Sequence, residues 1–94
     1  MFGKKQTYHG LISVVMPSYN HERYIGAAVD SVLGQTYSNL ELIIVDDGST
    51  DNSAEILERI TDPRVRVFAQ KNQGAHAAIN RGLGLATGEY VAIL

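Results

Sequence analysis

The stretch LELIIVDDGST, residues 40–50, decides the fold of this chain. Its first six residues form a largely aliphatic run, which is typical of a strand buried on both faces of a parallel sheet. The cluster that follows, from Asp46 to Thr50, contains the residue types of a loop that leads into a helix. The stretch therefore predicts a buried strand, a loop and the start of a helix, in that order.

The same alternation of strand and helix runs through the rest of the chain. Residues 11–16 form another aliphatic run, which we expect Pro17 to end because proline cannot donate to a strand ladder. Residues 64–69 alternate like a short edge strand, and residues 90–94 open a fourth strand. The helical patterns that separate these strands start after Asn20, Asn52 and Gly74.

Strands and helices in this order require parallel strands, right-handed crossovers and helices on both faces of the sheet. The third helical pattern has a stripe of small residues, including Ala78 and Gly82, which allows the helix backbone to approach the sheet closely. We therefore predict an α/β fold, half of a doubly wound, Rossmann-like parallel sheet of about four strands.

Length and composition limit the classes of function. With 94 residues the chain is at most one small domain, and its 8 basic against 10 acidic side chains leave no positive excess to bind nucleic acid or an anionic membrane. Residues 1–10 lack the apolar run of a signal peptide, so we expect a flexible tail there and the folded part over residues 11–94. No run is long enough for a transmembrane helix, and the absence of cysteine fits a reducing compartment, so we expect a cytoplasmic protein.

The loops at the carboxyl ends of the strands are where an open α/β sheet binds its ligands. A dinucleotide-binding fold would place G-x-G-x-x-G directly after the first strand, but residues 17–22 there read PSYNHE. Gly82, Gly84 and Gly88 imitate that spacing at the end of a helix, where their amides cannot cradle a phosphate. A Rossmann cofactor domain is therefore disfavoured.

The acidic pair Asp46 and Asp47 leaves two interpretations open. In the first, both carboxylates cap the following helix and bind the amides of Gly48 and Ser49. In the second, one carboxylate faces the ligand crevice and accepts a ring N–H of a base such as uracil, a charge-assisted hydrogen bond worth about 1.5–3 kcal/mol. An EF-hand calcium loop is excluded because Gly48 follows Asp47 directly.

Four motifs in order carry a resemblance to a known family. They are ISVVMPSYN at residues 12–20, SVLGQTY at 31–37, ELIIVDDGSTD at 41–51, and N-x-G-x-x-x-A-x-N-x-G from residue 72 followed by A-x-G-E-Y from residue 86. Together they resemble the opening of a family-2 glycosyltransferase, and the resemblance covers residues 11–94.

The resemblance implies a GT-A fold that binds a nucleotide-diphosphate-sugar, a UDP-sugar first of all, and transfers the sugar with inversion to an acceptor hydroxyl. It also implies binding roles by motif position. At the nucleoside, Pro17 and Tyr19 flank the base, Asp47 accepts a hydrogen bond from the base, and Glu22 lies near the nucleoside. Asp46 braces the loop that carries Asp47, and Gly74 and Ala78 lie near the sugar diphosphate. Purely structural roles remain open for three of them, because Pro17 can simply end a strand, Tyr19 can cover core and Glu22 can serve the helix dipole.

In the family, the fourth strand leads into an Asp-x-Asp motif that holds Mn²⁺ or Mg²⁺ against the diphosphate, and the general base follows later. The resemblance therefore implies a truncated chain that holds the nucleotide-binding part, with a divalent metal bound only in the full-length enzyme. We expect the chain alone to be catalytically inactive, and a membrane association of the full-length protein stays open. The alternative is an inactive nucleotide-binding or structural fragment that forms a homodimer through the edge strand at residues 90–94.

Overall fold

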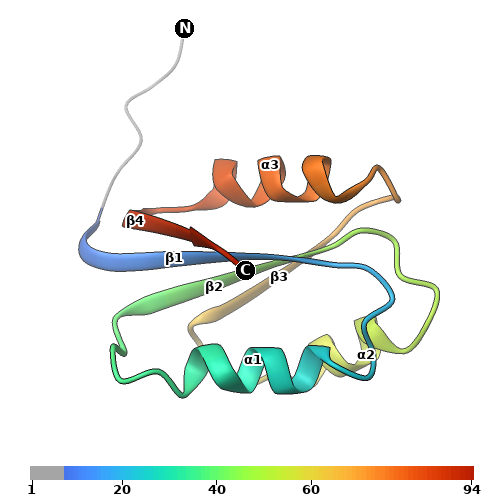
Figure 1. Cartoon of the computed structure of the whole chain (residues 1–94), viewed down its shortest axis with the longest axis horizontal. Helices are drawn as coiled ribbons and strands as arrows, with labels where there is room; N and C mark the ends of the chain where they lie inside the picture. The colour runs from blue at the N-terminus through green and yellow to red at the C-terminus, as the bar shows by residue number, and fades with distance from the viewer. Residues whose placement is uncertain (1–7) are drawn as a thin grey trace, which may run out of the picture.

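The computed structural model describes residues 8–94 and places them in an alternating series of strands and helices (Figure 1). The elements are β1 (Tyr8–Ser18), α1 (Ile25–Leu33), β2 (Leu40–Asp46), α2 (Ser53–Glu58), β3 (Val65–Ala69), α3 (Ala75–Leu85) and β4 (Gly88–Ile93). The strands form one four-stranded sheet in the order β3-β2-β1-β4, and all neighbouring strands are parallel. The predicted α/β fold with a parallel sheet is confirmed.

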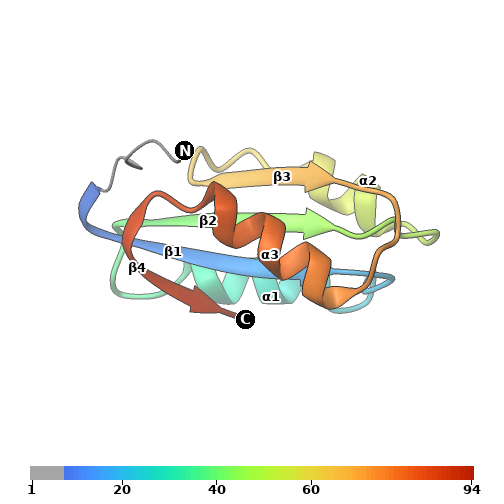
Figure 2. The same cartoon turned by 90° about the horizontal axis from the view of Figure 1, so that it is seen from above.

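Helices cover both faces of the sheet, as predicted. Helices α1 and α2 lie on one face, and α3 lies on the other (Figure 1). The view from above shows β3 at one edge of the sheet and β4 at the other, with β1 and β2 between them (Figure 2).

Strand β2 is the centre of the core and is buried along its whole length. Side chains that point to one face of the sheet, such as Leu42, pack in a cluster with α1 and with Leu57 of α2. Side chains that point to the opposite face, such as Ile43, pack in a second cluster with Ala78 of α3. This burial on both faces explains why the strand reads as an aliphatic run rather than as an alternating pattern.

Helix α3 approaches the sheet most closely at Gly82. A Cβ atom at this position would lie 2.3 Å from Val15 Cγ1 of β1, so the space holds no side chain. The predicted close approach of a small-residue stripe to the sheet is therefore confirmed.

Two expectations about β1 require correction. The strand begins at Tyr8, whose amide donates to the Thr87 carbonyl at 3.0 Å, so the expected tail over residues 1–10 is too long. Residues 1–7 of that tail lie outside the described residues. The strand also runs through Pro17 rather than ending there. The Val15 carbonyl accepts the Leu94 amide on the β4 side, and the backbone of Pro17 faces that same side, so its missing N–H removes no hydrogen bond from the ladder with β2.

A buried polar network joins the amino ends of the strands around Glu41 of β2. Its carboxylate accepts hydrogen bonds from Ser13 Oγ at 2.5 Å, from the Thr87 amide at 2.7 Å and hydroxyl at 2.9 Å, and from Arg66 Nη1 at 3.2 Å. Burial by itself would raise the pKa of Glu41, but these hydrogen bonds outweigh it and hold the pKa below its ordinary value. The network therefore keeps a charge inside the fold and links β1, β2, β3 and the residue before β4.

Candidate functional site

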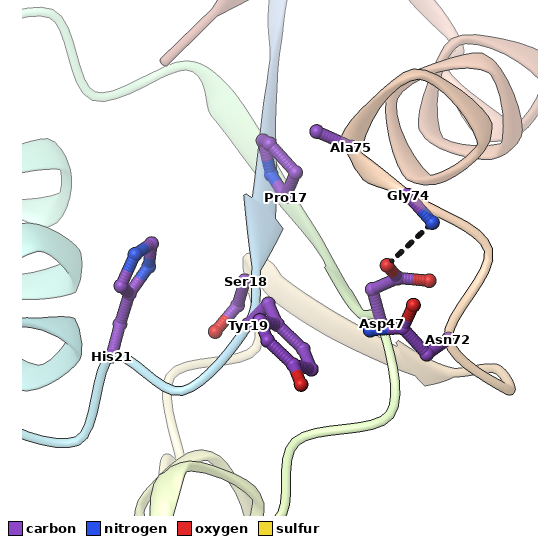
Figure 3. Close-up of a pocket in the computed structure, with 8 residues that line it drawn as sticks. All are labelled: Pro17, Ser18, Tyr19, His21, Asp47, Asn72, Gly74 and Ala75. Atoms are coloured by element: carbon purple, nitrogen blue, oxygen red, sulfur yellow. Dashed lines mark hydrogen bonds between the residues drawn. The ribbon is translucent and has the colours of Figure 1, made fainter.

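A pocket lies at the carboxyl ends of β1, β2 and β3, where open parallel sheets bind ligands. Its volume is about 230 Å³. The end of β1 and the loops after the three strands supply its lining (Figure 3): Pro17, Ser18, Tyr19, His21, Asp47, Asn72, Gly74 and Ala75.

Asp47 forms the acidic wall of this pocket. Only 3% of the residue is exposed, and its carboxylate binds the loop between β3 and α3. Oδ1 accepts hydrogen bonds from Gln70 Nε2 at 2.9 Å and from the Gln73 amide at 2.8 Å, and Oδ2 accepts the Gly74 amide at 2.9 Å. The bond to Gly74 is drawn in Figure 3.

These hydrogen bonds favour the ionised form of Asp47. The side chain of Gln70 and the Gln73 amide lower the pKa of Asp47 below its ordinary value, and with the Gly74 amide they outweigh the opposing effect of burial. A carboxylate offers about four acceptor positions, of which three are used here, so the Asp47 carboxylate can accept one further hydrogen bond.

The loops after β2 and β3 also touch through their backbones. Gly48 has a φ of +77°, and a Cβ atom on it would lie 2.8 Å from the Asn72 amide nitrogen. Glycine is required here both by the left-handed backbone and by the lack of space. The contact holds Asn72 beside Asp47, on the same side of the pocket (Figure 3).

Asp46 has a separate role. Its Oδ1 accepts the Ser49 hydroxyl at 2.5 Å and its Oδ2 accepts the Ser49 amide at 3.3 Å, and it is absent from the pocket lining. The expected bond from the Ser49 amide to this acidic pair is therefore present at Asp46. The expectation that both carboxylates cap the following helix is wrong, because Asn52 is the N-cap of α2 without a side-chain cap and Asp47 bonds the loop before α3 instead.

Pro17 and Tyr19 line the pocket on the side of β1. Tyr19 is 44% exposed, so its ring does not cover core and remains available to a ligand. Figure 3 shows Tyr19 at the end of β1, separated from the loop that carries Asn72 and Gly74 by Asp47. The pocket thus has one aromatic and one acidic wall.

Two of the expected site residues lie away from the lining. The side chain of Glu22 is exposed and absent from the lining. The Glu22 amide donates a hydrogen bond to Asp51 Oδ2 at 3.2 Å. Ala78 is fully buried and packs in the core beneath α3. The structure brings Pro17, Tyr19, Asp47 and Gly74 together and leaves Glu22, Asp46 and Ala78 outside this group.

Four lining residues were not predicted from the sequence: Ser18, His21, Asn72 and Ala75. Ser18 is buried in the strand, and its hydroxyl has no hydrogen-bond partner within the described part of the chain. His21 stands alone in a polar loop, without the spacing of a metal ligand. Asn72 follows β3, and its place at the site depends on the contact with Gly48, for which the sequence carries no local signal.

Residues 8–94 contain no group of three or more histidine, cysteine, aspartate or glutamate side chains that could hold a metal ion. Over the same residues, no helix is long and apolar enough to cross a membrane. The pocket itself offers a hydrogen-bond acceptor, Asp47, and an aromatic ring, Tyr19.

The fold is that of a doubly wound α/β protein with a pocket at the carboxyl ends of its strands, the place where such folds bind ligands. The family model for glycosyl transferase family 2 matches residues 13–94. The chain belongs to glycosyl transferase family 2. Among curated proteins it is similar to glycosyltransferase GlyG of Streptococcus pneumoniae serotype 4, with 52% identity over 89% of this chain and 29% of GlyG. It is also 49% identical to an uncharacterized glycosyltransferase of Haemophilus influenzae, over 89% of this chain and 35% of that protein.

Solved structures support the same fold. The mannosyltransferase PcManGT from Pyrobaculum calidifontis, in complex with GDP-Man and Mn²⁺, matches with a TM-score of 0.80 and 30% identity over 95% of this chain and 28% of its own. TarS 1-349 of S. aureus in complex with UDP matches with a TM-score of 0.81 and 31% identity over 88% of this chain and 26% of its own. The Rossmann-like part of a GT-A fold, implied by the resemblance, is confirmed. This chain spans only about a third or less of the length of these proteins.

Proposed function

We propose that this chain is the donor-binding part of a glycosyltransferase that transfers a sugar, with inversion, from a nucleotide-diphosphate-sugar to an acceptor hydroxyl. The observation that carries the proposal is the Asp47 carboxylate, which lines the pocket, has a lowered pKa and keeps one acceptor position open. The GDP-Man complex of PcManGT and the UDP complex of TarS support this class of ligand, because both similar proteins hold a nucleotide.

In this proposal the charge of Asp47 selects among bases. An ionised carboxylate only accepts hydrogen bonds, so it fits a base that presents a ring N–H. Uracil N3 and guanine N1 carry such a hydrogen, whereas the corresponding ring nitrogens of cytosine and adenine are acceptors. Asp47 then binds the edge of the base, Pro17 and Tyr19 contact its faces, and a UDP-sugar is the expected donor.

The remaining expected residues have supporting roles in this proposal. Asp46 braces its loop through Ser49. Gly74 lines the pocket without a side chain and leaves room for the diphosphate, and Ala78 contributes by letting α3 lie close to the sheet. Glu22 is exposed beside the site and approaches the nucleoside only if the loop after β1 adjusts on binding.

The described residues do not fit the Mn²⁺ or Mg²⁺ that the resemblance implies, because they contain no cluster of metal ligands. No step of the proposal therefore runs through a metal held by residues 8–94. We propose that the full-length enzyme supplies the metal ligands and the general base from residues beyond this segment, and that the segment alone does not turn over. We also propose a cytoplasmic location. The outer edge of β4 is unpaired within the described sheet, and we propose that it pairs with a second copy of the chain.

Titration with nucleotides, followed by backbone amide NMR shifts, tests the base-binding role. UDP is expected to shift the resonances of Tyr19 and Gly74 and to bind about tenfold or more tightly than CDP. In Asp47→Asn the affinity for UDP should fall by about tenfold or more, because an amide group replaces one carboxylate oxygen opposite donors such as Gly74. Asp30→Asn, which changes an exposed carboxylate on α1, is the matched control and should bind UDP as the original chain does.

Equal affinities for UDP and CDP would contradict the role given to Asp47. If neither UDP nor GDP shifts the resonances of the pocket, the proposed function itself is wrong.

A further inference from the structure

Asn20 joins the loop after β1 to the loop after β2. Its side-chain Oδ1 accepts hydrogen bonds from the Thr50 amide at 2.8 Å, the Asp51 amide at 3.3 Å and the Thr50 hydroxyl at 3.4 Å. Its own amide donates to Ser49 Oγ at 2.9 Å. One residue therefore contacts three consecutive residues of a loop about thirty positions further along the chain.

The backbone of Asn20 is held in an unusual conformation. Its φ of 52° is the only positive value at a non-glycine residue within residues 8–94. Asparagine tolerates this left-handed region better than most residues, but the conformation persists only where the surroundings fix it. The sequence predicts Asn20 as the cap of the first helix. This prediction is wrong, because α1 starts at Ile25 with Tyr24 as its N-cap and the Asn20 side chain serves the other loop.

The hydrogen bonds of Asn20 continue to both walls of the pocket. Ser49 Oγ, which accepts the Asn20 amide, donates to Asp46 Oδ1 at 2.5 Å. Asp46 directly precedes Asp47, the acidic wall, and Tyr19, the aromatic wall, directly precedes Asn20. The chain of bonds from Asn20 through Ser49 to Asp46 thus runs between the two walls, beside the backbone bond from the Asp47 amide to the Ser18 carbonyl at 2.8 Å.

We infer that Asn20 is a positioning residue for the base pocket, which holds Tyr19 in place opposite Asp47 without touching the ligand. The inference rests on the proposed function. Other bonds also join these loops, from the His21 amide to Ser53 Oγ at 2.9 Å and from the Glu22 amide to Asp51 Oδ2 at 3.2 Å. These bonds do not use the Asn20 side chain, so its replacement should loosen Tyr19 without unfolding the loops.

Two substitutions separate the side-chain bonds of Asn20 from its backbone conformation. Asn20→Gly keeps the left-handed backbone and removes the acceptor, whereas Asn20→Asp keeps an acceptor oxygen at the same place. UDP is expected to bind about tenfold more weakly to Asn20→Gly and within about threefold of the original affinity to Asn20→Asp. Amide hydrogen exchange of Thr50 and Asp51 should speed up in Asn20→Gly, while exchange of buried β2 amides such as Ile43 stays unchanged, a separation that general destabilisation would not produce.

Ser49→Ala provides a second test, because it removes the acceptor of the Asn20 amide. It should weaken UDP binding by about threefold to tenfold. If Asn20→Gly does not fold, Ser49→Ala replaces it in the binding experiment. If the original chain binds UDP and Asn20→Gly (or, where that variant does not fold, Ser49→Ala) binds it equally well, the inference is overturned and the proposed function stands. The inference is also overturned if Asn20→Asp is as weak as Asn20→Gly. If the original chain binds neither UDP nor GDP, the proposed function and this inference fall together.

Discussion

Two carboxylates, Glu41 and Asp47, lie at opposite ends of the sheet, and hydrogen bonds lower the pKa of both. Their donors differ in kind. Glu41 is bonded by a side chain of β1, a side chain of β3 and Thr87 before β4, whereas Asp47 binds two backbone amides and one side chain of a single loop. The first arrangement ties strands together, and the second shapes a pocket. Residues of one chemical type thus tie strands together at one end of the sheet and line a pocket at the other.

The lowered pKa of Glu41 predicts how stability depends on pH. A carboxyl group with a lower pKa in the folded than in the unfolded chain stabilises the fold above its unfolded pKa, near the ordinary 4.5, and loses this contribution as the pH falls through the folded value. Glu41→Gln should therefore reduce the free energy of unfolding by about 2 kcal/mol at pH 7 and by progressively less below about pH 4.5. Urea unfolding at a series of pH values measures the difference.

Glu58→Gln, at an exposed position of α2, is the matched control and should leave the free energy of unfolding nearly unchanged at each pH. A Glu41→Gln loss that is the same at pH 3 and pH 7 would show that the Glu41 charge does not stabilise the fold.

Among the elements, α3 lies against the sheet at a glycine that leaves no space for a side chain. Gly82 faces Val15 with no room for a Cβ atom, whereas a Cβ atom on Gly84 would meet nothing within 4 Å. Both glycines lie in the same helix, so their intrinsic effect on helix formation is similar and only their contacts differ.

Gly82→Ala and Gly84→Ala are therefore expected to have opposite effects. Gly84→Ala should stabilise the chain by about 0.5–1 kcal/mol, because alanine favours a helix over glycine. Gly82→Ala should destabilise it by about 1–3 kcal/mol net, because the overpacked contact with Val15 outweighs the same gain. Thermal unfolding of the two variants measures both changes. A stabilised Gly82→Ala variant would mean that α3 can move away from the sheet at little cost.

The periodicity of the sequence predicted these elements, but it did not predict the contacts between their loops. Aliphatic runs and small-residue stripes are local patterns, so the order of elements and the close approach at Gly82 could be read from them. The start of β1 was missed because Tyr8, His9 and Gly10 carry no aliphatic pattern. The partners of Asn20 and Asp47 lie 23 to 31 residues away, and no local signal specifies which loop amides a polar side chain will meet. Of the lining of the candidate site, Pro17, Tyr19, Asp47 and Gly74 were accordingly predicted, but the hydrogen bonds between loops that bring them together were not.

At the scale of the whole molecule, the two edges of the sheet differ. Strand β3 at one edge carries Arg64 just before it and Arg66 within it, and Arg66 reaches Glu41 and the ring of Phe68. Strand β4 at the other edge presents exposed apolar side chains, with Tyr90, Val91 and Ile93 at 63%, 47% and 54% exposure. An apolar edge with unpaired backbone groups is the feature that promotes association between sheets.

Self-association should therefore occur through β4. Sedimentation of the chain over a range of concentrations is expected to show a dimer that Val91→Lys shifts toward monomer, because a charged side chain disfavours edge pairing. Val67→Lys, at an exposed position of β3, is the matched control and should leave the dimer intact. A chain that sediments as a monomer at all concentrations, or that responds equally to both substitutions, would contradict pairing through β4.

Under the proposed function Asp47 both binds the base and holds a loop, which has a consequence for any attempt to redesign the proposed nucleotide preference. Its carboxylate holds the segment from Gln70 to Gly74 in place, so an engineer who replaced it to admit cytosine or adenine would also release that segment. A successful redesign has to replace the base contact and the support of this segment together. The same holds for evolution by single mutations, because we expect a substitution of Asp47 to release the segment before the pocket accepts another base.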